Sequence, residues 1–297
     1  MARFSVLAPQ IGAGLAAAIM IVAGFAFAPA ATPEPAVAET SGARSVDLGV
    51  VEAGVRGQPR ETTPAAASEP SEPLLLVVID DVGLDVDAAR RLMDLPVTLA
   101  ILPYADAAPV IAAEARAAGR EVFVHLPMEP VGLEDPGPGA IVTGMTAETL
   151  RARLAWAFSR VPGAAGFNNH MGSRMTSDPG AMAALFAAAP EGELVFLDSL
   201  THPRSVAARA AADAGLASLS RDVFLDAEPG QAAAQLDRAI ALAASQGQAI
   251  AIGHPYPETL QALESLREKA AAQGVVLTTA RALADRRRAE TRAPTHS

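Results

Sequence analysis

From Leu74 onward, short apolar runs alternate with longer Ala-rich segments whose apolar positions recur at helical spacing. The runs lie at residues 74–80, 97–103, 121–127, 194–199, 222–226, 249–255 and 275–279. They are continuous rather than alternating, which is typical of parallel strands that are buried on both faces by helices. We therefore predict an α/β fold with about seven parallel strands in a closed or nearly closed β/α barrel. An open doubly wound sheet is the alternative.

The chain before Leu74 has a different pattern. Residues 11–31 carry no charge for about 20 residues, the length that a bilayer-spanning helix needs. We expect residues 1–31 to be an uncleaved signal anchor, with a cleaved signal peptide as the alternative. Residues 32–73 are rich in Pro, Ala and Glu and keep no regular period, so we expect a disordered linker there. The β/α domain is expected over 74–285, with a polar tail at 286–297.

Such an arrangement predicts an exported protein that is held at the inner membrane by its N-terminal helix and faces the periplasm. The 297 residues include 33 acidic and 23 basic side chains, for a formal charge of −10. This balance disfavours nonspecific binding to nucleic acid, and we expect no nucleic-acid partner. The sequence contains no cysteine, so a metal ion would have to be held by His, Asp or Glu.

Carboxylates and imidazoles gather where the predicted strands end or just beyond. They are Asp80, Asp81, His125, His170, Asp198, Asp226 and His254. Taken singly, an Asp pair often caps a helix and a lone His is often structural. In parallel β/α folds, however, the carboxyl ends of the strands form the ligand site, so these side chains are expected to converge.

Two imidazoles and one carboxylate form an open site for Zn²⁺ or a similar divalent ion. A second carboxylate beside that site can take a proton from the activated water. The adjacent aspartates are therefore expected to divide these roles, one as ligand and one as base.

Several segments together carry a resemblance to a known family. They are IDD at 79–81, VTLAILP at 97–103, GREVFVHLPMEP at 119–130, NNHMGS at 168–173, RDVFLD at 221–226 and IGHP at 252–255. In this order and spacing they resemble the divergent polysaccharide deacetylase family, a distant branch of the metal-dependent polysaccharide deacetylases. The similarity extends over about residues 74–285, the whole expected domain. It implies a distorted β/α barrel that removes acetyl groups from an N-acetylated envelope polysaccharide.

The resemblance also implies roles for individual residues. Asp80 matches the base, Asp81 and His125 match metal ligands, and His254 matches the general acid. Arg221 and Asp222 resemble charged residues that orient the base and tune the acid. Asn169 and Asp198 are our candidates for substrate binding.

One feature departs from the ordinary deacetylases, which take two metal-binding histidines from one His-x-x-x-His turn. Four residues after His125 this chain has Glu129, and Pro127 argues against a helix there. We expect His170 to be the missing ligand, with Glu129 as the alternative.

Two other functions remain open at this point. A weak or inactive barrel could serve as an envelope scaffold that binds a glycan or a protein. The scarcity of Trp and Tyr, which are limited to Trp156, Tyr104 and Tyr256, argues against a surface dedicated to sugar stacking. Hydrolysis of another amide or ester would use the same machinery with a different pocket.

Overall fold

The computed structural model describes residues 72–292. The expected anchor at 1–31 and nearly all of the expected linker lie outside these residues. Within 72–292, no helix has both the length and the apolar character needed to cross a membrane.

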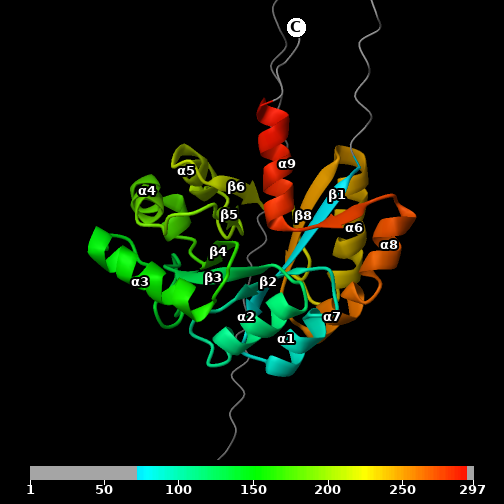
Figure 1. Ribbon diagram of the computed structural model, residues 1–297, viewed down its shortest axis with the longest axis horizontal. Helices are drawn as coiled ribbons and strands as arrows, with labels where there is room; N and C mark the ends of the chain where they lie inside the picture. The colour runs from blue at the N-terminus through cyan, green and yellow to red at the C-terminus, as the bar shows by residue number, and fades with distance from the viewer. Residues whose placement is uncertain (1–71, 293–297) are drawn as a thin grey trace, which may run out of the picture. The chain divides into compact units, whose positions relative to one another are not determined.

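In the described residues, nine strands form one sheet in which the paired strands run parallel (Figure 1). The strands are β1 (Leu74–Val82), β2 (Thr98–Ile101), β3 (Val122–Met128), β4 (Gly166–Met171), β5 (Val195–Asp198), β6 (Ala217–Ser220), β7 (Val223–Phe224), β8 (Gln248–Gly253) and β9 (Val276–Thr278). Their order is β6-β5-β4-β3-β2-β1-β8-β7, and β9 pairs with the first three residues of β1. This confirms the predicted parallel α/β fold.

The two edge strands, β6 and β7, are consecutive in the chain and are separated by Arg221 and Asp222. The Arg221 N–H donates to Asp198 O at the end of β5 (3.1 Å), and the Asp222 N–H donates to Ile250 O in β8 (2.8 Å). The main chain therefore crosses the gap between the edges, and the barrel is distorted as the resemblance implied.

The helices are α1 (Val86–Leu92), α2 (Ala108–Ala117), α3 (Ala147–Arg160), α4 (Pro179–Ala187), α5 (Ala207–Asp213), α6 (Ala232–Gln246), α7 (Pro257–Leu263), α8 (Leu266–Ala272) and α9 (Ala280–Arg292), with a 3₁₀ turn at Met175–Ser177. Helices α1 to α8 lie around the outside of the sheet (Figure 1). The outward side chains of β1, namely Leu75, Val77 and Ile79, are buried in the core on that side.

Helix α9 packs inside the barrel instead. Its Leu283 and Ala284 share a buried cluster with Leu76, Phe123 and Ile250 from three strands. The helix continues to Arg292, beyond the domain end that we expected at Asp285.

A carboxylate fixes the start of α9. Both oxygens of Glu121 accept main-chain N–H groups, from Ala280 (2.8 Å) and Arg281 (2.9 Å). A negative charge at the first turn suits the helix dipole. Because Glu121 immediately precedes β3, this contact holds α9 at the amino ends of the strands.

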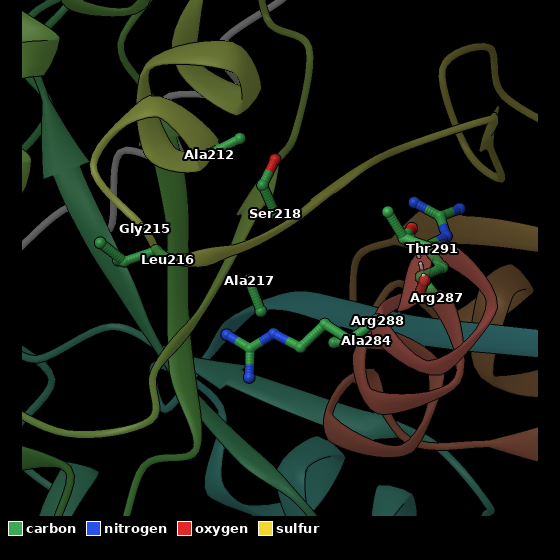
Figure 2. Close-up of a pocket in the computed structure, with 9 residues that line it drawn as sticks. All are labelled: Ala212, Gly215, Leu216, Ala217, Ser218, Ala284, Arg287, Arg288 and Thr291. Atoms are coloured by element: carbon green, nitrogen blue, oxygen red, sulfur yellow. Dashed lines mark hydrogen bonds between the residues drawn. The ribbon is translucent and has the colours of Figure 1, made fainter. Parts of the chain in front are cut away.

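A groove of about 460 Å³ lies between α9 and the start of β6 (Figure 2). Ala217 and Ser218 line one side of it, and Arg287 and Arg288 line the other. It lies at the amino ends of the strands, so it is separate from the carboxyl ends, where the predicted site residues lie.

Candidate metal centre and active site

The end of β1 turns two adjacent aspartates toward one site. Alternation along the strand places Asp80 on the inner face with Leu76 and Val78, and would send Asp81 outward. The register of β1 is irregular between Ile79 and Val82, and Asp81 adopts a left-handed φ of 57°. Such a bulge redirects a side chain. Asp81 therefore joins Asp80 at the carboxyl end of the barrel.

The register between β3 and β4 aligns the two histidines. His125 follows Phe123 by two positions on the inner face of β3 and pairs with Asn168. His170 pairs with Pro127 and lies two residues after Asn168, on the same face of β4. As expected, Pro127 lies in an extended strand rather than in a helix.

Three potential ligand atoms meet at this place. Asp81 Oδ1 lies 2.8 Å from His170 Nδ1 and 3.2 Å from His125 Nε2. The two imidazole nitrogens are 3.2 Å apart. Asp81 Oδ1 is buried, and no N–H or O–H group of residues 72–292 is oriented to donate a hydrogen bond to it. A buried acceptor without a donor, beside two imidazole nitrogens, fits the ligand set of a divalent cation with open positions.

The two aspartates differ in their electrostatics. Burial raises the pKa of Asp80, whose side chain is 4% exposed, and this outweighs the opposing effect of His125 and His254. Burial alone would also raise the pKa of Asp81, but its contacts with His125 and His170 hold that pKa well below the usual range. Asp81 is thus the stronger anionic ligand, and Asp80 is the better proton acceptor.

His254 faces the cluster from the end of β8. Its Nε2 lies 3.8 Å from Asp81 Oδ2, and its Nδ1 lies 3.0 Å from Asp226 Oδ1. Asp226 also accepts the His254 main-chain N–H (2.6 Å) and the Thr259 hydroxyl (2.8 Å), so its carboxylate is firmly held. Burial by itself would lower the pKa of His254, but the bond to Asp226 and its charge raise that pKa to about 9.

Arg221 lies between β6 and β7, close enough to Asp80 for their charges to interact. Its Nε donates to Ser199 O (2.9 Å), and its Nη2 donates to Leu200 O (3.2 Å). The guanidinium lies 4.7 Å from the centre of the Phe224 ring, and its charge interacts with Asp80. Arg221 therefore fixes the loop after β5 and contributes positive potential near Asp80.

Two aspartates that we expected in the site point elsewhere. Asp222 precedes β7, and its Oδ2 accepts the Ile250 N–H (2.8 Å). Asp198 lies on the outer face of β5, where it accepts the Leu200 N–H (2.9 Å) and the Ser205 hydroxyl (2.7 Å). Both carboxylates hold the main chain or a loop, and neither belongs to the cluster around Asp81.

Asn169 and Glu129 also have structural partners. The Asn169 side chain accepts the Ser199 N–H (2.9 Å) and donates to Met171 O (2.8 Å), because its position on β4 faces away from that of His170. One oxygen of Glu129 accepts both the N–H and the hydroxyl of Thr143, each over 2.7 Å. The third member of the ligand cluster is therefore His170 rather than Glu129.

Two side chains of the site received no role from the sequence. Asn168 is fully buried between His125 and Asp80. Its position two residues before His170 places it on the same strand face, which was the available signal. Asp226 follows β7 at the carboxyl edge, and the position at the strand end was again the signal.

Two aromatic side chains lie close enough to influence the site. The ring of Tyr256 is 5.3 Å from that of His254 at an angle of 33°, and the residue is 49% exposed. Burial raises the pKa of the Tyr104 hydroxyl, and the negative charge of nearby Asp81 raises it further. Trp156 is on α3, where it packs against Gly139.

Comparisons with known proteins agree with this fold. The sequence profile described as divergent polysaccharide deacetylase matches residues 77–284. An uncharacterized protein of Haemophilus influenzae is 42% identical over 195 residues, covering 64% of this chain and 70% of that protein. The uncharacterized protein YibQ of Escherichia coli K12 is 36% identical over 196 residues, 65% of this chain and 61% of YibQ. The crystal structure of the uncharacterized protein ATU2773 from Agrobacterium tumefaciens has the same fold, with a TM-score of 0.68 and 24% identity over 73% of this chain and 91% of that chain.

Proposed function

Because this chain belongs to the divergent polysaccharide deacetylase family, we propose that it is a metal-dependent hydrolase that removes acetyl groups from an N-acetylated envelope polysaccharide. The observation that carries the proposal is the convergence of Asp81, His125 and His170, with Asp80 and His254 beside them. A scaffold needs no such set, in which potential ligands, a buried carboxylate and a hydrogen-bonded imidazole meet at one rim.

Asp81, His125 and His170 would hold the divalent ion, and Zn²⁺ suits this mixture of nitrogen and oxygen donors. When bound, such an ion lowers the pKa of a coordinated water and polarises a carbonyl oxygen. The oxygen of Asp80 that is not bonded to Asn168, Oδ2, is 3.7 Å from His125 Nε2 and is therefore turned toward the site. Asp80 accepts the proton of the attacking water through this oxygen.

His254 supplies the proton that the leaving amine requires. Asp226 bonds to Nδ1, which leaves Nε2 facing the cluster. With a pKa raised to about 9, the imidazole is protonated at neutral pH and can act as general acid. Proton transfer to the amide nitrogen accompanies cleavage of the C–N bond, and acetate and a free amino sugar are released.

The cellular location is also part of the proposal. The uncharged run at 11–31 supports export and attachment to the inner membrane, and the Pro-rich segment that follows supports a tether in the periplasm. A reporter enzyme that is active only in the periplasm, fused after residue 297, should be active, and the protein should sediment with membranes. Cytoplasmic reporter signal would contradict this location.

The direct test is acetate release from N-acetylated glycans by the full-length protein. Zinc-loaded protein should release acetate, and the chelated protein should regain activity when zinc is returned. The control is Glu129→Gln, which alters an acid outside the cluster. A wild-type protein that binds zinc but cleaves no N-acetylated glycan would remove the substrate assignment. One that binds no divalent ion would remove the metal-dependent mechanism and favour the scaffold.

A further inference from the structure

Asn168 lies between Asp80, the proposed base, and His125, a proposed metal ligand. Its side chain is fully buried, and its Nδ2 donates to Asp80 Oδ1 over 2.7 Å and to Ser199 Oγ over 3.1 Å. Its Oδ1 lies 2.9 Å from His125 Nδ1. One amide therefore contacts both the proposed base and a proposed metal ligand.

These partners determine which way the amide points. An ionised carboxylate can only accept hydrogen bonds, so the amide atom that faces Asp80 is the NH₂ group. The amide oxygen then faces His125 Nδ1, which has to be the protonated nitrogen of the neutral ring. The lone pair is left on Nε2, the nitrogen that lies 3.2 Å from Asp81 Oδ1.

We propose that Asn168 is a positioning residue that sets the tautomer of His125 for metal binding and, through the same amide, holds the carboxylate of Asp80 toward the site. The inference rests on the proposed function, in which Asp80 is ionised and His125 is a ligand. A hydrogen-bonded partner on the second nitrogen of a metal-binding histidine fixes its ring in this way. Here the partner is neutral and is shared with the base.

The geometry gives this role to Asn168 because of its place in the sheet. The register pairs it directly with His125, and Asp80 lies on the same inner face with two strands between them in the order β4-β3-β2-β1. Ser199, the residue that follows β5, accepts a hydrogen bond from the other N–H of the amide. All polar atoms of the amide are therefore engaged, and the side chain has one orientation.

The first test compares the full-length wild type with Asn168→Leu, which keeps the branch at Cγ and has no polar side-chain atom. Zinc affinity, measured by competition with a chromophoric chelator, should fall about 10- to 100-fold, as is typical when a ligand loses its outer partner. The matched control is Thr98→Val, which removes the hydrogen bond that the hydroxyl of the buried Thr98 donates to Glu121 (2.8 Å) at the amino end of β2. It should lower stability and leave zinc affinity unchanged. Equal affinity in Asn168→Leu and wild type, or equal losses in Asn168→Leu and Thr98→Val, would overturn the inference.

A second variant covers the case in which Asn168→Leu does not fold. Asn168→Asp keeps an acceptor opposite His125 Nδ1, so zinc affinity should stay within a few-fold of wild type. Acetate release should fall, because a carboxylate that competes with Asp80 for a proton replaces the N–H donor. A fall in zinc affinity of about 10- to 100-fold, the loss expected when His125 Nδ1 has no acceptor, would contradict the proposal that Asn168 sets the tautomer of His125.

The last measurement needs neither zinc nor activity. Nitrogen-15 chemical shifts of His125 in the metal-free protein, recorded at a pH at which the shifts themselves show a neutral ring, should show a protonated Nδ1 in wild type and Thr98→Val. A protonated Nε2 in wild type would overturn the inference even if zinc binds. Conversely, a protonated Nδ1 in a protein that binds no zinc would leave the tautomer assignment intact and defeat the proposed function alone.

Discussion

Asp81 Oδ1 lies 2.8 Å from His170 Nδ1, which joins the irregular end of β1 to the end of β4. The contact depends on a single left-handed residue, since regular alternation would turn Asp81 away from the barrel. Asn and Asp tolerate this conformation better than most other residues that have a Cβ. Because of the bulge, the adjacent Asp80 and Asp81 both reach one site, where Asp80 bonds to Asn168 and Asp81 contacts His170.

Replacement of His170 should separate the two ligand assignments that the sequence left open. We expect His170→Ala to lower zinc affinity by more than the roughly 10- to 100-fold that loss of an outer partner costs. Glu129→Gln should retain wild-type affinity, because Glu129 bonds to Thr143 instead. Isothermal titration of the metal-free proteins measures both, and the reverse order of affinities would restore Glu129 as the ligand.

Asp80→Asn should abolish most turnover while zinc binding persists. An amide cannot take the proton of the attacking water, so kcat should fall by about 10²–10⁴-fold. The fold should survive, because an amide oxygen can still accept the Asn168 Nδ2–H. Steady-state acetate release and zinc titration provide the two readouts. Full activity in this variant would refute the assignment of the base.

The pH dependence should identify which aspartate tunes the acid. Because His254 acts in its protonated form, activity should decline as pH rises through about 9, the value to which Asp226, with smaller contributions from Asp81 and Asp80, raises its pKa. Asp226→Asn removes that charge, so the alkaline limb should move to lower pH, toward the ordinary 6.5. The Asp222→Asn control should leave the limb in place, since Asp222 bonds to Ile250 N. An alkaline limb that moves in Asp222→Asn and stays in Asp226→Asn would favour the role inferred from the sequence.

Tyr256 should contribute to sugar binding, because its half-exposed ring lies beside His254. Aromatic rings offer sugars an apolar face with a polar edge. We expect Tyr256→Ala to raise KM several-fold with little change in kcat, in assays over a range of glycan concentrations. Trp156→Ala is the control, since Trp156 is also a partly exposed aromatic residue (36%, against 49% for Tyr256) but lies on α3. A fall in kcat alone would indicate that Tyr256 positions His254 instead.

Gly166 should be required for strand pairing at the start of β4. A Cβ at this position would collide with the main-chain oxygen of Val195 in β5. Gly166→Ala should therefore lower the free energy of unfolding by about 1–3 kcal/mol, the usual cost of overpacking. Gly180→Ala, in the first turn of α4 where a Cβ meets only the Asp178 carboxylate at 3.4 Å, should be neutral or slightly stabilising. Chemical denaturation measures both, and equal stability of Gly166→Ala and wild type would show that the strands can separate to fit the methyl group.

Two strands of the structure, β4 and β6, were not among the strands predicted from the sequence, because of their composition. Strand β4, GFNNHM, carries Asn168 and His170 on its inner face, so it lacks a continuous apolar run. Strand β6, ASLS, has four residues and alternates in burial. In β4, the polar residues that build the site are the same ones that hide the strand.

The sequence by itself determined the parallel α/β fold, through continuous apolar strands, and the gathering of Asp80, Asp81, His125, His170 and His254 at strand ends. Those inferences depend on local patterns and on the common direction of parallel strands. The tertiary structure decided the partners: His170 rather than Glu129 beside Asp81, Asp226 rather than Asp222 beside His254, and Asn168 rather than Asn169 toward the site. In each case the outcome depends on a bulge, a register or the face of a strand, and a shift of one residue in any of these turns a side chain to the opposite side of the sheet.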